Sequence, residues 1–112
     1  MLRDIKIWLY DILNAITEIE SFLKDTPNNF NYFENDTITK RAIERNIEII
    51  GEAVNRILHK DDSIVLSNAK KIVQTRNKII HEYDSVSDEI IWSIVIRHLP
   101  ILKTEIEELL SK

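Results

Sequence analysis

The sequence predicts an all-α protein, an antiparallel bundle of four to five helices. Apolar residues recur at spacings of three and four over several long stretches, as on the buried face of an amphipathic helix. The 112 residues include one glycine and two prolines, so few positions interrupt helices. Hydrophobic residues make up 44% of the chain, enough for one core, and we expect a single domain over residues 1–112.

The first helix is expected over residues 2–23, where apolar side chains return every three or four positions without a break. Residues 25–36 then contain Pro27, four asparagines and no helical period, so we predict a loop. Aromatic side chains can pin this loop to the body of the protein: Phe30, Tyr32 and Phe33. The N-terminal third is therefore predicted to be one long helix and an irregular connection.

Further helices follow from the same spacing. The second is expected over residues 36–58, the third over residues 67–83 and the fourth over residues 88–99. Residues that commonly cap helices precede the second and the fourth: Asp36 or Thr37, and Ser87. Pro100 then either kinks the chain or begins a fifth helix that ends near Leu110, because proline fits only the first turn of a helix.

Gly51, the single glycine, lies in the middle of the second helix on its buried stripe. A glycine at such a position costs about 1 kcal/mol relative to alanine, so its presence needs a structural reason. Close approach of another backbone provides one. We therefore predict that the third helix crosses the second at Gly51.

Three polar side chains interrupt the apolar pattern of the third helix. A helix advances about 100° per residue, which places Arg76 on one stripe with Ile79. The adjoining stripe carries Asn77 and His81 beside Ile80. These groups are expected to point where aliphatic side chains would pack, and burying each without a partner costs about 2–7 kcal/mol. Physical chemistry alone favours a structural polar network over an open cleft.

The spacing R-x4-H-x-Y at residues 76–83 resembles the signature of the HEPN nucleases and, more narrowly, of the HepT-like toxins. Other segments resemble that family in the same order along the chain. Residues 10–16 are similar to its opening helix, and residues 45–54 to its second helix, including the Gly-Glu-Ala step. Trp92 and residues 99–102 stand where the family has its closing W…LP-x-L segment. The resemblance thus covers nearly the whole chain as one HEPN/HepT-like helical domain.

The resemblance implies a metal-independent endoribonuclease that uses no cofactor and acts on RNA. Arg76, Asn77 and His81 are then the catalytic residues. Histidine suits proton transfer near neutral pH, and a guanidinium can neutralise the charge on a phosphorane. Asn77 would donate to a phosphate oxygen or hold the His81 ring in one tautomer. Lys71 and Lys78 would bind the RNA backbone.

Two polar residues of the second helix are candidates to contact Arg76 from behind and hold it in place. Asn46 lies on an apolar stripe and Glu52 lies at its edge, so either could support the arginine from inside. The alternatives are a core hydrogen bond for Asn46 and an ion pair with Arg56, four residues on, for Glu52. The acidic residues of this helix are otherwise interpreted as a solvated face rather than a metal site: Glu44, Glu48 and Glu52.

The geometry of a single helix argues for a dimer. Arg76 and His81 are about 140° apart around the helix, so they do not converge well within one chain. Two copies of the third helix packed about a two-fold axis would bring both pairs to one cleft. The resemblance implies the same homodimer.

Tyr83 has a separate role in the family that this sequence resembles. There a partner nucleotidyltransferase, acting as the antitoxin, attaches AMP to the tyrosine of the motif and silences the nuclease. The resemblance implies such a partner here and modification at Tyr83. We expect the added phosphate to lie close to Arg76 and to block RNA by charge and bulk.

Charge and composition limit the remaining classes. The net charge of −4 argues mildly against a general nucleic-acid binder, although residues 69–80 carry four cations and no acid. With no cysteine, no leader and no apolar run of about 18 residues, we expect a cytoplasmic protein that does not bind a membrane. The runner-up function is a non-catalytic helical module that binds a nucleotidyltransferase or a nucleotide, and the third is a purely structural bundle.

Overall fold

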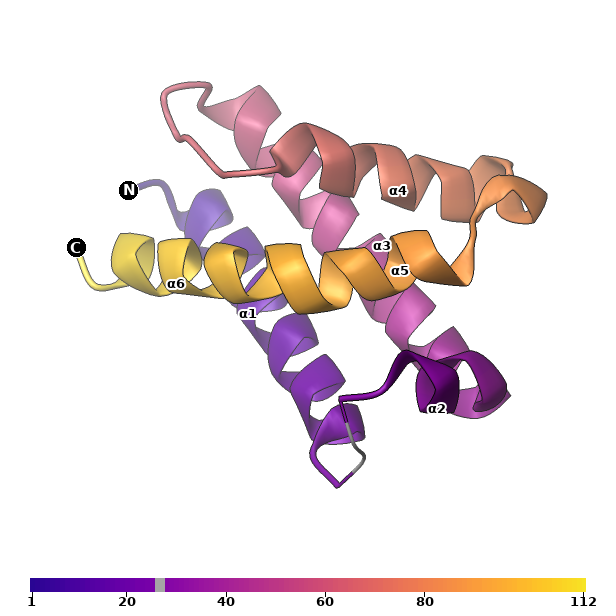
Figure 1. The fold of residues 1–112 in the computed structure, drawn as a ribbon. Coiled ribbons are helices and arrows are strands. Elements are labelled where there is room, and N and C mark those ends of the chain that lie inside the picture. The colour runs from indigo at the N-terminus through magenta and orange to yellow at the C-terminus, as the bar shows by residue number, and fades with distance from the viewer. Residues whose placement is uncertain (26–27) are drawn as a thin grey trace.

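The computed structural model describes residues 1–25 and 28–112, and the regular elements in those two ranges are all helical (Figure 1). They are α1 (Arg3–Leu23), α2 (Phe30–Asn35), α3 (Thr37–Lys60), α4 (Ala69–His81), η1 (Tyr83–Ser85), α5 (Asp88–Ser93), η2 (Ile94–His98) and α6 (Leu99–Leu110). The predicted all-α bundle is thereby confirmed. Pro27, expected in the first loop, lies outside the described residues. Among the helices described, none is both long and apolar enough to cross a membrane.

Isoleucine stripes on α1 and α3 form the centre of the core. The two helices pack against each other, and α6 also packs against α1. Each long helix buries the stripe that its spacing predicted, except that Leu23, at the end of α1, is only half-buried. The other members are at most 2% exposed: Ile5, Leu9, Ile12, Ile16 and Ile19 on α1, and Ile43, Ile47, Ile50, Val54 and Ile57 on α3. Full burial of one such side chain stabilises a fold by about 1.5–3 kcal/mol, so these stripes hold the bundle together.

A short helix, α2, occupies part of the segment that we predicted to be an irregular loop. Asn29 caps it, because its Oδ1 accepts hydrogen bonds from the N–H groups of Asn31 (2.8 Å) and Tyr32 (3.3 Å). Phe33 is fully buried, and its ring centroid lies 5.0 Å from that of Trp92, so this aromatic does anchor the segment. Tyr32 is 45% exposed and does not anchor the segment. The helix has six residues, too few to show a period in the sequence.

Two predicted N-caps are confirmed. At the start of α3, the Asp36 carboxylate accepts from the Thr39 N–H at 3.1 Å. At the start of α5, the Ser87 hydroxyl accepts from the Ile90 N–H at 3.2 Å. Each cap satisfies a backbone donor that the first turn of a helix leaves without a partner.

The helix that carries the candidate catalytic residues, α4, is shorter than predicted at both ends. It begins at Ala69, after Asn68 adopts the left-handed conformation (φ 61°), which asparagine tolerates better than most residues. It ends at His81, and Tyr83 follows in the 3-10 turn η1. His81 therefore lies in the last turn of the helix and Tyr83 lies beyond it.

Three consecutive elements, α5, η2 and α6, follow one another along a single rod in Figure 1. Pro100 lies in the first turn of α6. Of our two alternatives for this proline, a kink or the start of a further helix, the second therefore applies. Before Pro100, in the π-helical segment η2, the Leu99 N–H donates to the carbonyl of Ile94, five residues earlier. This wider turn leaves room for the proline ring, which would otherwise collide with the carbonyl four residues before it.

Helix α4 crosses α3 at Gly51, as the position of the single glycine predicted. A Cβ atom on Gly51 would collide with the Cβ atom of Arg76 and would lie 2.8 Å from its Cγ atom. It would also lie 3.4 Å from the carbonyl oxygen of Ile72. The glycine therefore lets α4 approach α3 closely and fixes the point from which the Arg76 side chain extends.

Candidate active site

One edge of α4 faces the core. Ile72, Thr75 and Ile79 are buried, and α4 packs mainly on α3. Arg76 lies beside these three residues with its side chain 24% exposed. It is the catalytic candidate that the fold places on the buried side of the helix.

Asn77 and His81 do not point toward the core, contrary to our expectation. Both are exposed, and so is Ile80 at 42%. One main neighbour, α3, covers α4, so much of the circumference of this helix faces solvent in the single chain, including the stripe of Asn77 and His81. Among the described residues, none forms a hydrogen bond or ion pair with the His81 imidazole, which is therefore available to a substrate or to a second chain.

Glu52 of α3 holds the Arg76 guanidinium. Arg76 Nη2 donates to Glu52 Oε2 at 2.5 Å. Arg56 Nε donates to the other carboxylate oxygen, Oε1, at 3.0 Å. Both interpretations of Glu52 therefore apply together, because one carboxylate pairs with an arginine on its own helix and with Arg76 on the next. Charge-assisted bonds of this kind fix the direction of a guanidinium.

The guanidinium keeps donors for a substrate. Of its five N–H groups, one on Nη1 donates to Asn77 Oδ1 at 2.9 Å and one on Nη2 donates to Glu52. Nε is buried and has no acceptor within the described part of the chain. One N–H remains on each terminal nitrogen of Arg76, and two such groups can bind two phosphate oxygens side by side.

Arg76 borders a groove of about 320 Å³ between α1, α3 and α4. The groove is lined by three arginines and three carboxylates: Arg45, Arg56, Arg76, Asp11, Glu48 and Glu52. Trp8, Ile49 and Ile80 add apolar surface. Because positive and negative side chains are equal in number, recognition of a phosphate here depends on which N–H donors are free rather than on excess charge.

The predicted RNA-binding lysines lie in a different groove. Lys71 and Lys78 line it together with Asn77, and its volume is about 560 Å³. The structure therefore brings Asn77 to the two lysines and Arg76 to Glu52. The two groups are linked by the Arg76–Asn77 hydrogen bond.

Asn46 forms hydrogen bonds in the core and does not support Arg76, which was the other alternative for this residue. Its amide donates to the Ala42 carbonyl at 3.0 Å and to Glu18 Oε1 of α1 at 3.3 Å. Asn46 is 4% exposed, so these bonds satisfy a buried amide and join α3 to α1. Of the two candidates, Glu52 is the one that bonds Arg76 from α3.

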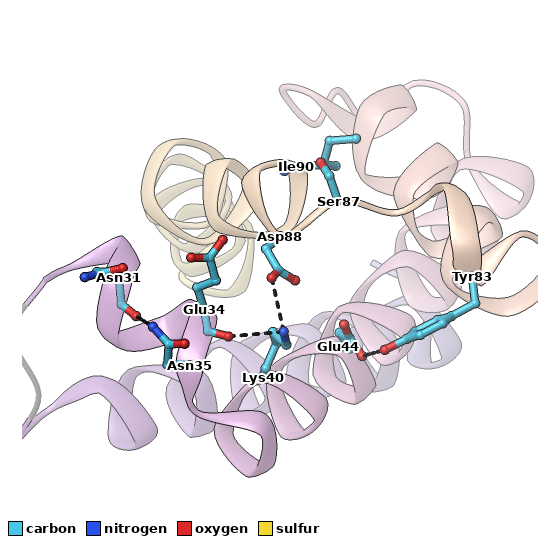
Figure 2. A network of polar contacts seen from close by, with 9 residues as sticks. All are labelled: Asn31, Glu34, Asn35, Lys40, Glu44, Tyr83, Ser87, Asp88 and Ile90. Atoms are coloured by element: carbon cyan, nitrogen blue, oxygen red, sulfur yellow. Dashed lines mark hydrogen bonds and ion pairs between the residues drawn. The ribbon is translucent and has the colours of Figure 1, made fainter.

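Tyr83 reaches back from η1 to α3 (Figure 2). Its hydroxyl donates to Glu44 Oε1 at 2.8 Å, and the residue is 46% exposed. The hydrogen bond to Glu44, together with burial, raises the pKa of Tyr83. Glu44 and Glu52 are two helical turns apart, about 12 Å along the axis. The unmodified Tyr83 hydroxyl is therefore held at Glu44, about two turns of α3 away from the carboxylate that holds Arg76.

Sequence reasoning missed Glu44. We interpreted it as part of a solvated acidic face, but it is 8% exposed and is bonded to Tyr83. The available signal was its place directly after Ile43, at the rim of the buried stripe of α3. That signal alone does not identify the tyrosine, because Tyr83 reaches the carboxylate through the turn after α4.

A guanidinium with free donors and an imidazole that has no partner in residues 1–25 and 28–112 lie on one helix of this bundle, and together they define a candidate phosphodiester-cleaving site. The chain matches the ribonuclease HepT-like family over residues 12–109. It is similar to "Putative RNase MJ1380" of Methanocaldococcus jannaschii, with 36% identity over 94% of this chain and 95% of that protein. It is also similar to "Putative RNase TTE0752" of Caldanaerobacter subterraneus, with 39% identity over 74% of this chain and 75% of that protein.

A third relative is "Probable ribonuclease HepT" of Thermococcus cleftensis, with 34% identity over 97% of this chain and 98% of that protein. No solved structure matches the chain significantly. The chain therefore belongs to the HepT-like ribonuclease family. This confirms the family that R-x4-H-x-Y and its accompanying segments indicated, and with it the enzyme class, a ribonuclease.

Proposed function

We propose that this protein is the toxin of a toxin–antitoxin pair, a metal-independent endoribonuclease that acts as a homodimer. Its activity stops when a partner nucleotidyltransferase attaches AMP to Tyr83. One observation carries the proposal: α4 presents Arg76, with free N–H donors at a groove, and His81, exposed and unpaired within the described residues. Family membership supports ribonuclease activity, and the residue roles, the dimer and the modification are our inference.

Cleavage of RNA without a metal needs a group that transfers protons and a fixed cation. The ribose 2′-hydroxyl attacks the adjacent phosphorus, the bond to the 5′ oxygen breaks, and a cyclic phosphate and a 5′-hydroxyl form. His81 accepts the proton of the 2′-hydroxyl, because imidazole titrates near neutral pH. The free N–H groups of Arg76 bind the phosphate oxygens, which gain negative charge in the transition state. The 5′ oxygen takes its proton from water, so one site needs only Arg76 of one subunit and His81 of the other.

The surface between Arg76 and His81 supports the homodimer. Around α4, the side chains that separate the two are Ile80, Val73 and Asn77. Ile80 is 42% exposed and Val73 is half-buried. Apolar side chains between polar ones are typical of a surface that an assembly covers. A two-fold axis through this strip would bring Arg76 of each chain toward His81 of the other.

The position of Tyr83 supports its modification. The residue is 46% exposed, and η1 follows closely after the helix end that carries His81. AMP on this side chain adds a nucleotide and a negative charge next to the proposed catalytic histidine, and both oppose the binding of RNA. Protein co-produced with its transferase is expected to gain the mass of one or more AMP groups, and Tyr83→Phe is expected to gain none.

The proposal is tested with purified protein and total RNA in EDTA. Wild-type protein is expected to cleave the RNA and leave cyclic phosphate ends. His81→Ala is expected to cleave at least about 100-fold more slowly, because general acid–base catalysis typically contributes that much or more. His59→Ala is the matched control, since His59 is exposed on α3 and bonds the Asn55 carbonyl. Loss of cleavage in EDTA, or full activity of folded His81→Ala, would contradict the proposal.

A further inference from the structure

The contact between Tyr83 and Glu44 joins the proposed modification site to a buried carboxylate. Glu44 is 8% exposed, and its Oε1 accepts the Tyr83 hydroxyl at 2.8 Å. Figure 2 shows the ring extending from the turn after α4 to α3, with its oxygen directed at Glu44. In residues 1–25 and 28–112, Tyr83 is the side chain that donates to this carboxylate. The pair is therefore a phenol and a potential base in direct contact.

We propose that Glu44 is the proton acceptor when AMP is transferred to Tyr83. This inference rests on the proposed modification of Tyr83 and places the base within the acceptor protein itself. A phenol is a weak nucleophile while it holds its proton, and a positioned base removes that obstacle during the reaction. A carboxylate already within hydrogen-bond distance of the hydroxyl meets the geometric requirement for such a base. A tyrosine hydroxyl is protonated at neutral pH, and the contact with Glu44 raises the pKa of Tyr83 further, so the transfer needs an acceptor for this proton.

The step is a nucleotidyl transfer from ATP held by the transferase. The Tyr83 oxygen forms a bond to the α-phosphorus, the bond from that phosphorus to the oxygen bridging it to the β-phosphate breaks, and pyrophosphate leaves. The phenolic proton moves to Glu44 Oε1 and is later released to water. The modified tyrosine can no longer donate, and its phosphodiester is negative, so the side chain moves away from ionised Glu44.

The charges around the pair agree with this role. Arg41 of α3 and Asp88 of α5 both act electrostatically on the Tyr83 hydroxyl, with opposite signs. The Lys40 ammonium is engaged by Asp88 at 3.1 Å and by a backbone carbonyl at the end of α2 at 3.3 Å (Figure 2). Lys40 therefore leaves Glu44 free to accept a proton. Arg41 is exposed and can meet the phosphate of the incoming nucleotide.

Glu44→Gln tests whether Glu44 acts as a base or only as a hydrogen-bond acceptor. The amide oxygen of glutamine still accepts a hydrogen bond from Tyr83 but cannot take its proton. The protein is incubated with Mg-ATP and its cognate nucleotidyltransferase, and AMP incorporation is followed by intact mass across neutral and mildly alkaline pH. At neutral pH, Glu44→Gln is expected to react at least about 100-fold more slowly than wild type. The ratio of variant to wild-type rate is expected to rise up to about tenfold per pH unit, as the tyrosinate fraction grows.

Two further variants complete the experiment. Glu44→Asp keeps a carboxylate and is expected to recover part of the rate and the wild-type pH dependence. Glu89→Gln removes an exposed acid from the first turn of α5 and is expected to react as wild type does. Equal rates for wild type and folded Glu44→Gln at every pH would overturn the role of Glu44 and leave modification of Tyr83 standing. Wild-type protein that gains no AMP, or gains as much as Tyr83→Phe does, would overturn both.

Discussion

Glu52 and Arg76 form an ion pair across two helices, with Oε2 and Nη2 2.5 Å apart, directly beside the point where Gly51 lets α4 approach α3. The glycine sets the separation of the helices, and the carboxylate sets the direction of the guanidinium. Arg56 in turn holds the second oxygen of Glu52. Arg76 is therefore oriented at the groove by contacts within the chain itself. Such a preorganised cation stabilises a transition state without the cost of reorienting it.

Glu52→Gln removes the charge that orients Arg76 while keeping a side chain of similar shape. The rate of RNA cleavage is expected to fall about tenfold, because small displacements of a catalytic group cost one to two orders of magnitude. The free energy of unfolding is expected to change by less than about 1 kcal/mol, since both side chains are partly exposed. Single-turnover cleavage and urea unfolding measure the two effects, with exposed Glu107→Gln as the control. Lower stability at an unchanged rate would make the pair purely structural.

Gly51→Ala is expected to destabilise the protein, although alanine is the better helix former. The added methyl group would collide with Arg76 and push α4 away from α3. Overpacking of this kind typically costs about 1–3 kcal/mol, against a gain of about 1 kcal/mol in helix propensity. Urea unfolding measures the net change, and Gln74→Ala on the exposed side of α4 is the control. A more stable Gly51→Ala variant would contradict the close approach.

Tyr83→Phe is expected to alter the response of stability to alkaline pH. The hydrogen bond to Glu44 raises the pKa of Tyr83 above its ordinary value of 10.0, so the folded state binds this proton more tightly than the unfolded state. By linkage, the stabilisation is complete below about pH 10 and is lost as pH rises through the folded-state pKa. The unfolding free energies of wild type and Tyr83→Phe should therefore converge in alkali. A difference that is constant with pH would argue against the Glu44 contact.

His98 is expected to make the protein less stable in mild acid. Its Nε2 atom is buried without a partner among the described residues. Burial lowers the pKa of His98 below 6.5, and the charges of Lys71 and Arg97 lower it further. Stability from neutral His98 is therefore present above about pH 6.5 and is lost as pH falls through the folded-state pKa.

Urea unfolding at several pH values tests this expectation for His98. His98→Gln should weaken the decline in unfolding free energy below about pH 6.5, because the variant has no group to protonate there. His59→Gln should not, since His59 is exposed on α3. Identical slopes for wild type and His98→Gln would show that another group causes the decline.

Features that depend on one element and its sequence were predictable. The buried stripes of α1 and α3 follow from apolar spacing, and the caps at Asp36 and Ser87 follow from residue type. Gly51 predicted the crossing of α3 and α4, because a lone glycine inside a helix needs a reason. The short helix α2 was not predictable, since it depends on Phe33 packing against Trp92 far along the chain.

The orientation of the candidate side chains could not be predicted from the sequence. R-x4-H-x-Y indicated Arg76 and His81, whose catalytic roles stay predictions, and the family comparison confirms the class of enzyme to which that motif belongs. The direction in which each side chain points depends on how much of α4 its neighbours cover, which periodicity on one helix does not reveal. The hydrogen bond between Glu44 and Tyr83 is likewise a tertiary contact, which the spacing within α3 does not reveal.

The central claim is that Arg76 of one subunit and His81 of another act on the same phosphodiester. Subunit exchange between Arg76→Ala and His81→Ala tests this most directly, because each mixed dimer then holds one site with both wild-type side chains. With random pairing, the mixture is expected to recover about a quarter of the wild-type cleavage rate, although each variant alone is nearly inactive. A mixture that stays as inactive as its components, after mass spectrometry has demonstrated exchange, would contradict the composite site.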